Sequence, residues 1–217
     1  MRLKAMAKIN LGLDVLGKRE DGYHEVRMIM QTIRMYDILD IRKTRRPGIV
    51  LTTNLPFIPT DQRNLVYKAA QMLMEEFDVE EGLSIKLRKF IPVAAGMAGG
   101  SSDAAAAFVG VNRMFHLGLT EEQLMERAVK VGADVPYCIM RGTALAEGIG
   151  EKLTRLPEVP KCYVLIGKPG INVSTKTAYE NLNLEGIGKH PDIDGLIGAI
   201  RNNDLYAMAS RMENVFE

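Results

Sequence analysis

A glycine-rich run between residues 91 and 103 constrains the fold of this chain more than any other feature. It reads Ile-Pro-Val-Ala-Ala-Gly-Met-Ala-Gly-Gly-Ser-Ser-Asp, and an alanine-rich segment follows at once. Glycine allows a backbone to approach a ligand closely, and alanine has the highest helix propensity. The pattern predicts a loop that leads into a helix over residues 104–116, closed by Gly118. Because N–H groups at a helix N-terminus bind phosphate, ATP is the ligand that this loop suggests.

The run differs from two familiar nucleotide-binding loops. A Walker loop needs a Lys-Ser/Thr pair after its glycines, and a dinucleotide site needs G-x-G-x-x-G; neither pattern is present. A turn that only packs a helix against a sheet remains the structural alternative. The Gly-Gly-Ser-Ser-Asp sequence at the helix start favours phosphate, because Ser101 and Ser102 can donate to phosphate oxygens or bind Mg²⁺. A helix from Asp103 onward would add its dipole.

Hydrophobic periodicity predicts a mixture of strands and helices along the rest of the chain. Alternation predicts strands over 9–15, 23–33, 36–42, 48–53 and 84–89, the first two joined by a hairpin with Asp21 and Gly22 at its tip. Helical spacing predicts helices over 61–77 and, after a capping box at Thr120–Gln123, over 120–131. We expect a tight turn over 132–136, an apolar strand over 162–167 and a mostly helical segment over 192–217.

Composition narrows the class of protein. The 217 residues carry a formal net charge of +1, which offers no field for holding a nucleic acid, and Lys86, Arg88 and Lys89 are expected to form only a short solvated strand face. Cys138 and Cys162 lie in apolar stretches without metal-ligand spacing, so we expect reduced core cysteines. The N-terminus shows no signal peptide or membrane anchor, and a cytoplasmic protein without a membrane partner is predicted.

The chain changes character after Gly150. A charged, proline-containing stretch over 151–161 separates the first part from the apolar run that follows. We therefore expect two domains, residues 1–155 and 156–217, in an α+β protein.

Several motifs together resemble one superfamily. Residues 92–107, P-V-A-A-G-M-A-G-G-S-S-D-A-A-A-A, are similar to the second signature motif of the galactokinase, homoserine kinase, mevalonate kinase and phosphomevalonate kinase (GHMP) superfamily. Matches in order to the 4-diphosphocytidyl-2-C-methyl-D-erythritol kinases are A-K-I-N-L at 7–11, D-G-Y-H-E at 21–25, G-A-D-V-P at 132–136 and G-I-G-E at 148–151. The resemblance implies the GHMP kinase fold: a domain like the second domain of ribosomal protein S5, then a partial ferredoxin-like domain.

The resemblance also implies the catalytic residues and the nucleotide site. Lys8 and Asp134 correspond to the family's catalytic pair, with Asp134 as general base for the acceptor hydroxyl and Lys8 neutralising the transferring phosphoryl group. From the residues alone, Asp134 would be a turn residue and Lys8 a solvated charge. Mg-ATP would be wrapped by the loop residues Pro92, Val93, Ala94, Ala95, Gly96, Met97, Ala98, Gly99, Gly100, Ser101 and Ser102. No metal ligand can be assigned from the sequence.

A cytidine-bearing acceptor is the small-molecule partner that the resemblance implies. His24 would read the cytosine beside Tyr23, Tyr179 would stack on the ring, and the remaining contacts would come from Asn10, near the methylerythritol, and Thr175, beside Tyr179. Residues 173–179 suit a lid over the base. Met30 stands where some relatives have a second aromatic residue, and its sulfur could contact the ring.

The sequence departs from the family in one respect. Members normally continue past the equivalent of residues 214–217 into a third glycine-rich motif, and the 217 residues end before it. We interpret the chain as the larger part of a kinase that phosphorylates the 2-hydroxyl of the cytidine-bearing acceptor in isoprenoid-precursor synthesis, as a monomer or homodimer. Three alternatives stay open: a homoserine or mevalonate type of kinase, a truncated paralogue that binds nucleotide without turnover, and an RNA-binding module.

Overall fold

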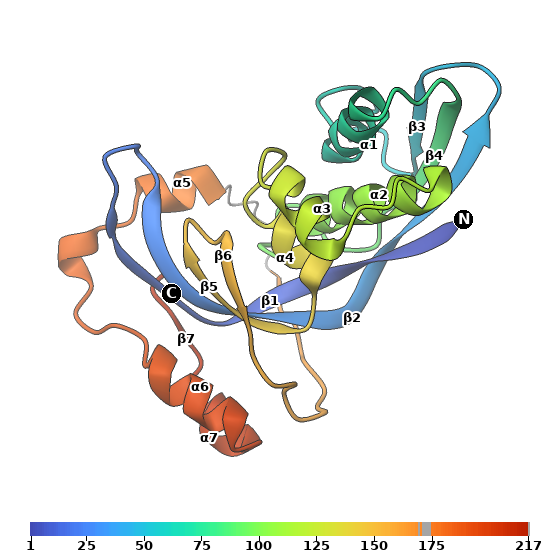
Figure 1. Ribbon diagram of the computed structural model, residues 1–217. Helices are drawn as coiled ribbons and strands as arrows, with labels where there is room; N and C mark the ends of the chain where they lie inside the picture. The colour runs from blue at the N-terminus through green and yellow to red at the C-terminus, as the bar shows by residue number, and fades with distance from the viewer. Residues whose placement is uncertain (169, 171–174, 217) are drawn as a thin grey trace. The chain divides into compact units, whose positions relative to one another are not determined.

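The computed structural model describes residues 1–168, 170 and 175–216. Two compact units are formed, each from separate stretches of the chain (Figure 1). Unit 1 comprises Met1–Lys8, Ile33–Val93 and Met97–Met140, and unit 2 comprises Ile9–Thr32, Ala94–Gly96 and Arg141–Glu217. The mixture of helices with parallel and antiparallel strands confirms the α+β class. The division into domains 1–155 and 156–217 stays a prediction.

Unit 1 contains a small mixed sheet. The second half of β2 (His24–Thr44) pairs antiparallel with β4 (Gly82–Arg88), with Ile41 opposite Ile85. Strand β3 (Ile49–Thr53) pairs parallel with β4, with Leu51 also opposite Ile85. These apolar residues are buried, so this face of the strands forms part of the unit's core.

Four helices complete the described part of unit 1. They are α1 (Leu65–Glu76), α2 (Gly99–Phe115), α3 (Glu121–Ala128) and α4 (Val135–Met140). Helix α2 contacts α1, α3 and α4, and α1 contacts β3 (Figure 1). Because α2 buries Ala104 to Phe108, it is the central helix of this unit.

Side-chain caps mark the start of two helices of unit 1. Helix α1 begins at Leu65 rather than at 61, because the Asn64 side chain accepts the Val66 N–H at 2.9 Å. The capping box at Thr120 and Gln123 is confirmed in α3. The turn over 132–136 is confirmed up to Asp134, but Val135 and Pro136 already belong to helix α4.

The main correction to the predicted elements concerns α2. The helix begins at Gly99, five residues before the predicted start at 104, with Ala98 as its N-cap. Gly99, Gly100, Ser101 and Ser102 therefore form its first turn and do not belong to the loop. The small size of Gly99 still matters in the helix, because an added Cβ there would lie 3.1 Å from the Lys89 Nζ.

Unit 2 is built on the first hairpin. Strand β1 (Arg2–Lys18) turns at Gly22, which has φ 86°, and Arg19 N–H donates to the Tyr23 carbonyl at 2.8 Å. The first half of β2 pairs antiparallel with β5 (Thr143–Gly148), which pairs with β6 (Lys152–Arg155). Strand β7 (Glu213–Asn214) pairs parallel with β1. The hairpin with a polar tip is thus confirmed.

Unit 2 also contains short helices, of which α6 and α7 contribute to its core. They are α5 (Thr175–Glu180), the 3₁₀ helix η1 (Leu184–Gly186), α6 (Ile193–Arg201) and α7 (Leu205–Ala209). Leu11 of β1 and Ile29 of β2 pack with Leu196 and Ile200 of α6. The mostly helical end predicted from residue 192 is confirmed, with β7 added.

Two further predictions about elements need correction. The strands predicted over 23–33 and 36–42 are confirmed from His24 onward, but they form one continuous strand, β2, since neither glycine nor proline stands at Arg34 and Met35 to interrupt it. Residues 162–167 form no regular element, because the described residues offer them no strand partner.

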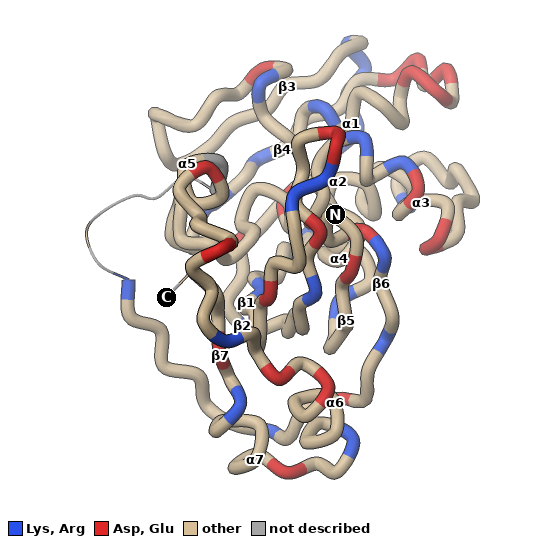
Figure 2. The backbone as a smooth tube through the Cα atoms, turned by 90° about the vertical axis from the view of Figure 1, so that its left-hand side faces the viewer, with Lys and Arg blue, Asp and Glu red and all other residues tan. Residues whose placement is uncertain are grey.

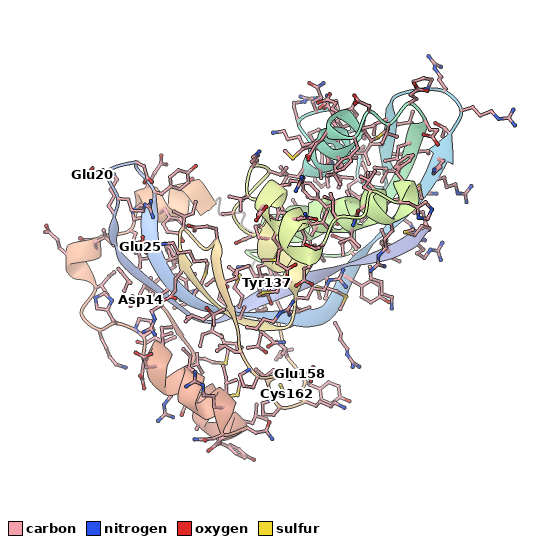
Figure 3. The ribbon with its side chains drawn as sticks, in the orientation of Figure 1. Asp14, Glu20, Glu25, Tyr137, Glu158 and Cys162 are labelled. Carbon is pink, nitrogen blue, oxygen red and sulfur yellow. The ribbon has the colours of Figure 1, made fainter. Side chains whose placement is uncertain are left out.

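The cysteines follow the prediction only in part. Both are thiols, as expected for reduced residues. Cys138 is buried in α4, in agreement with a core position. Cys162 is exposed, so its expected place in the core was wrong (Figure 3). Its apolar neighbours suggested burial, but the segment that carries it forms no strand.

Candidate functional site

The glycine-rich loop, residues 91–98, ends in strained backbone. Ala94, Gly96 and Ala98 have φ values of 54°, 68° and 52°, a region that alanine rarely adopts. Such conformations persist where the surroundings hold them in place, and they gather at ligand sites. The loop is thus held in a defined shape immediately before α2.

The first turn of α2 offers backbone donors. The N–H groups of Gly99, Gly100 and Ser101 have no acceptor within the helix, whereas Ser102 N–H donates to the Ala98 carbonyl at 2.8 Å. With 17 residues, α2 also directs the positive end of its dipole to this turn. An anion is the ligand that such a turn binds.

The two serines differ in what they can offer. The Ser102 hydroxyl is buried and donates to the Gly99 carbonyl at 3.0 Å, so it is used inside the protein. Ser101 is half-buried. Of the two hydroxyls expected to face phosphate or Mg²⁺, the Ser101 hydroxyl is the accessible one.

The predicted catalytic pair belongs to unit 1. Lys8 lies beside the loop on β1: its backbone N–H donates to the Met97 carbonyl at 3.2 Å. The residue is only 5% exposed, so its interpretation as a solvated charge is wrong. Asp134 is half-buried in the turn before α4, and its carbonyl accepts the Cys138 N–H at 3.1 Å.

A buried ion cluster, Asp37, Lys89 and Asp103, lies in the same unit and was missed from the sequence. The Lys89 ammonium donates to Asp37 Oδ2 and, at 2.6 Å, to Asp103 Oδ2. The three side chains are 0 to 4% exposed. The expectation that Lys89 belongs to a solvated face was therefore wrong. Alternation could have shown this, because Lys89 continues the buried series of Ile85 and Leu87.

The surroundings of Asp103 change the pKa of its carboxyl group. Burial raises the pKa of Asp103 well above its usual value; the Lys89 ammonium opposes this shift, and the Asp37 charge adds to it. Asp103 Oδ1 is buried without a hydrogen-bond partner among the described residues. A raised pKa favours the neutral form of Asp103 over a wider range of pH than in a free aspartate.

An open pocket of about 440 Å³ also lies in unit 1. It is lined by the end of β3 and the loop that follows, from Leu51 to Arg63. Asn54, in that stretch, accepts the Lys89 N–H at 2.8 Å and donates to the Lys89 carbonyl at 3.2 Å. The segment that lines the pocket is thus tied to the residue that precedes the glycine-rich loop.

Unit 2 contains an aromatic cluster, His24, Tyr179 and Phe216. The ring centroids of His24 and Tyr179 lie 5.0 Å apart with a 33° tilt, and Phe216 meets Tyr179 edge-on at 4.9 Å. The structure thus brings together two of the residues expected to read the base. Phe216 was missed, since no motif marks it. Its place follows from β7, because the Val215 N–H donates to the Leu13 carbonyl at 3.1 Å.

The remaining residues that were predicted to bind the acceptor substrate are not part of this aromatic cluster. Tyr23 is 59% exposed in the hairpin turn, and Asn10 is half-buried on β1. Thr175 begins α5, and residues 173 and 174 of the expected lid lie outside the described residues. Met30 is fully buried in the core, so the expected sulfur contact with a ligand ring was wrong.

Three further observations concern charge, metal ligands and membrane-spanning helices. Basic and acidic residues are interspersed along the backbone (Figure 2). Among the residues that the structure describes, three or more His, Cys, Asp or Glu side chains nowhere gather as a metal site would need. Within the same residues, every helix is too short or too polar to cross a membrane.

The fold and the loop define a class of protein. Residues 64–142, which include the glycine-rich loop and α2, match the model of the "GHMP kinases N terminal domain". A homoserine kinase from Cytophaga hutchinsonii shares the fold with a TM-score of 0.76 at 19% identity, over 99% of this chain and 71% of that one. The chain is a GHMP kinase in fold.

Closer relatives define the branch. The 4-diphosphocytidyl-2-C-methyl-D-erythritol kinases of Lachnospira eligens and Lachnoclostridium phytofermentans are 56% and 57% identical over 100% and 99% of this chain, and 75% and 74% of those proteins are covered. A crystal structure of 4-(cytidine 5'-diphospho)-2C-methyl-D-erythritol kinase matches with a TM-score of 0.75 at 30% identity, over 94% of this chain and 72% of that one. The chain therefore belongs to the 4-diphosphocytidyl-2-C-methyl-D-erythritol kinase family.

Proposed function

We propose that this chain transfers the γ-phosphate of Mg-ATP to the 2-hydroxyl of 4-diphosphocytidyl-2-C-methyl-D-erythritol, a step in isoprenoid-precursor synthesis. The observation that carries the proposal is the 56% identity, over all 217 residues, to a kinase of that name. The sites in the two units support it, each with the chemistry that one substrate requires.

The first turn of α2 is the proposed site of the triphosphate. The N–H groups of Gly99, Gly100 and Ser101 would donate to phosphate oxygens, and the helix dipole would add a favourable charge interaction. Left-handed backbone at Gly96 and Ala98 shapes the approach to this turn. The pocket beside β3 is the proposed place of the nucleoside, because its lining segment is tied to Lys89.

Lys8 and Asp134 are the proposed catalytic pair. Phosphoryl transfer needs positioning, charge neutralisation and a group that accepts the hydroxyl proton. A carboxylate at Asp134 would accept that proton. The backbone bond of Lys8 to Met97 supports the assignment of Lys8 as the neutralising group, because it ties this residue to the loop.

Mg²⁺ enters the proposal as part of the ATP complex. Magnesium in kinases is held largely by phosphate oxygens and water, with few protein ligands, so a site of this kind needs no dedicated cluster of carboxylates. The half-buried Ser101 hydroxyl could supply one oxygen ligand. The ion would then neutralise charge on the phosphates.

The aromatic cluster is the proposed reader of the cytosine. Stacking on an aromatic face stabilises a base, and a histidine beside it can hydrogen-bond to the base edge. Since the His24 and Tyr179 rings are in contact, they leave no space for a third ring between them. The base would therefore stack on an outer face of this pair or separate the two rings as it binds.

The test is product analysis with a panel of acceptors. The chain is incubated with Mg-ATP and, separately, with the cytidine-bearing acceptor, homoserine and mevalonate, and ³¹P NMR follows the products. We expect ADP and one new phosphomonoester at the 2-position with the first acceptor alone. Phosphorylation of homoserine or mevalonate at a similar rate would contradict the proposal.

His24 gives a sharper control. In a His24→Ala variant, the edge of the bound cytosine would lack its hydrogen bond to the histidine. Turnover of the cytidine-bearing acceptor should fall about tenfold, since a buried polar group without its hydrogen bond costs roughly 1–3 kcal/mol. The exposed His116, which closes α2 with left-handed backbone, provides the matched control as His116→Asn. That variant should retain full turnover.

A further inference from the structure

The buried ion cluster has a cost that folding stability does not explain. Asp37, Lys89 and Asp103 are each almost fully removed from water. Desolvation of charged groups is unfavourable, and a buried ion pair is often no more stabilising than apolar residues of the same volume. The cluster is therefore expected to serve another purpose, such as fixing one specific arrangement of the elements it joins.

Its members come from β2 and from the two segments that flank the glycine-rich loop in the chain. Asp37 lies on β2, Lys89 follows the last residue of β4, and Asp103 lies in the second turn of α2. The second oxygen of Asp37, Oδ1, accepts the N–H groups of Phe90 and Ile91 at 2.5 and 2.8 Å. One carboxylate thus holds both the Lys89 ammonium and the first backbone groups of the loop.

Lys89 is held through its main chain as well as its side chain. Asn54 hydrogen-bonds to both its N–H and its carbonyl. The ammonium lies close to the first residue of α2, because a Cβ added at Gly99 would come within 3.1 Å of Nζ. Lys89 therefore connects the residue before the loop to the first two turns of the helix after it.

We propose that Lys89 is a positioning residue for the phosphate site: held between Asp37 and Asp103, it fixes the first turn of α2 so that its backbone N–H groups face the phosphates of the nucleotide. The inference rests on the proposed function for the identity of the ligand. Lys89 does not touch the substrate and acts through the backbone of the first turn. The two carboxyl groups keep its ammonium in place while the loop carries strained backbone at Ala98.

The first test compares two lysines of the same segment. Lys89→Met removes the buried ammonium and keeps the length of the side chain, and Lys86→Met removes an exposed one. We expect Lys89→Met to raise the KM for ATP at least tenfold and to change the KM for the acceptor less than twofold. Lys86→Met should leave both constants unchanged. Equal KM values for ATP in wild type and folded Lys89→Met would overturn the proposal.

A second variant separates positioning from stability. If Lys89→Met does not fold, the double variant Lys89→Met/Asp103→Leu removes the buried cation together with the carboxyl group that lies against it and leaves Asp37 with its two N–H donors. We expect this variant to fold and still to bind ATP at least tenfold more weakly in calorimetry. Wild-type affinity in this variant would show that the cluster serves stability alone.

Hydrogen exchange distinguishes failure of this inference from failure of the proposed function. Without nucleotide, the amides of Phe90, Ile91 and Ser102 should exchange at least tenfold faster in Lys89→Met than in wild type, while amides of α3 stay unchanged. A wild-type chain that bound no ATP would count against the proposed function. Unchanged exchange at those three amides would overturn the positioning role whatever the nucleotide result.

Discussion

The two units prepare their proposed ligand sites in opposite ways. In unit 1, the proposed phosphate site lies beside the buried ion cluster, which is joined by charge and by hydrogen bonds to the backbone. In unit 2, the aromatic cluster consists of three half-buried rings that contact one another. The first site is organised by buried charge, and the second by contacts between rings.

The difference follows from what each ligand part requires. Phosphoryl transfer depends on groups held in place before the reaction, since reorganisation during the reaction costs rate. A base presents a broad aromatic face that tolerates small shifts of the stacking partner. Buried charge beside the proposed phosphate site and aromatic faces at the proposed base site are therefore suited to their tasks.

The largest expected effect concerns the proposed general base in unit 1. Asp134→Asn removes the proposed base without changing its size, so kcat should fall about 10²- to 10⁴-fold, while both KM values change little. The control is Asp78→Asn, since Asp78 is exposed and Asn tolerates its left-handed φ of 48°. Steady-state kinetics on both variants measure kcat and the two KM values. A kcat within fivefold of wild type would exclude Asp134 as the base.

The second prediction separates the two carboxyl groups of the ion cluster. Asp37→Asn should lower the free energy of unfolding by about 3 kcal/mol, near the lower limit for a broken buried pair, because Asp103 can then ionise and partner Lys89. Asp103→Asn should cost less than about 1 kcal/mol, because the raised pKa of Asp103 favours its neutral form. Urea denaturation measures both changes. Equal losses would contradict this difference between the two carboxyl groups.

The structure of the ion cluster was only partly predictable from the sequence. The strand that leads to Lys89 was predicted, and the alternation of Ile85 and Leu87 places Lys89 on the buried face. The partners of Lys89 lie 52 and 14 residues away along the chain, at Asp37 and Asp103, and a single sequence does not show such pairing. The glycine-rich motif, in contrast, predicted the loop because its chemistry is local.

The limits in unit 2 have a similar cause. The hairpin at Asp21–Gly22 was predicted, since turn preferences are local. The apolar run at 162–167 was expected to be a strand, but a strand needs a partner, and within the described residues Tyr163 and Leu165 are fully exposed. Phe216 lies in the aromatic cluster because β7 pairs with β1. Strand β7 has only two residues, and a strand of that length has no recognisable pattern in the sequence.

The third prediction tests the contrast at the rings of the aromatic cluster. Tyr179→Ala should raise the KM for the acceptor roughly five- to a hundredfold, as expected for the loss of one base-stacking contact, with the KM for ATP unchanged. Phe216→Ala should have a smaller effect, because Phe216 only supports Tyr179 edge-on. Tyr179→Phe should restore most of the affinity. A larger loss from Phe216→Ala than from Tyr179→Ala would contradict this order.

The smallest predicted effect is a dependence on pH. Because burial raises the pKa of Asp103 in the folded state, folding takes up a proton between the usual aspartate pKa and the raised one, and stability rises as the pH falls through that window. The slope for one group is at most about 1.4 kcal/mol per pH unit. Urea denaturation of wild type and Asp103→Asn at several pH values should show this slope in wild type alone. Parallel curves would contradict a protonated Asp103.

The most direct test of the contrast is a paired measurement of KM for ATP and for the cytidine-bearing acceptor in Lys89→Met and Tyr179→Ala. We predict that the first variant loses affinity for ATP alone and the second for the acceptor alone. If either variant raised both KM values to a similar extent, the two sites would not be prepared independently, and the contrast between the two units would be wrong.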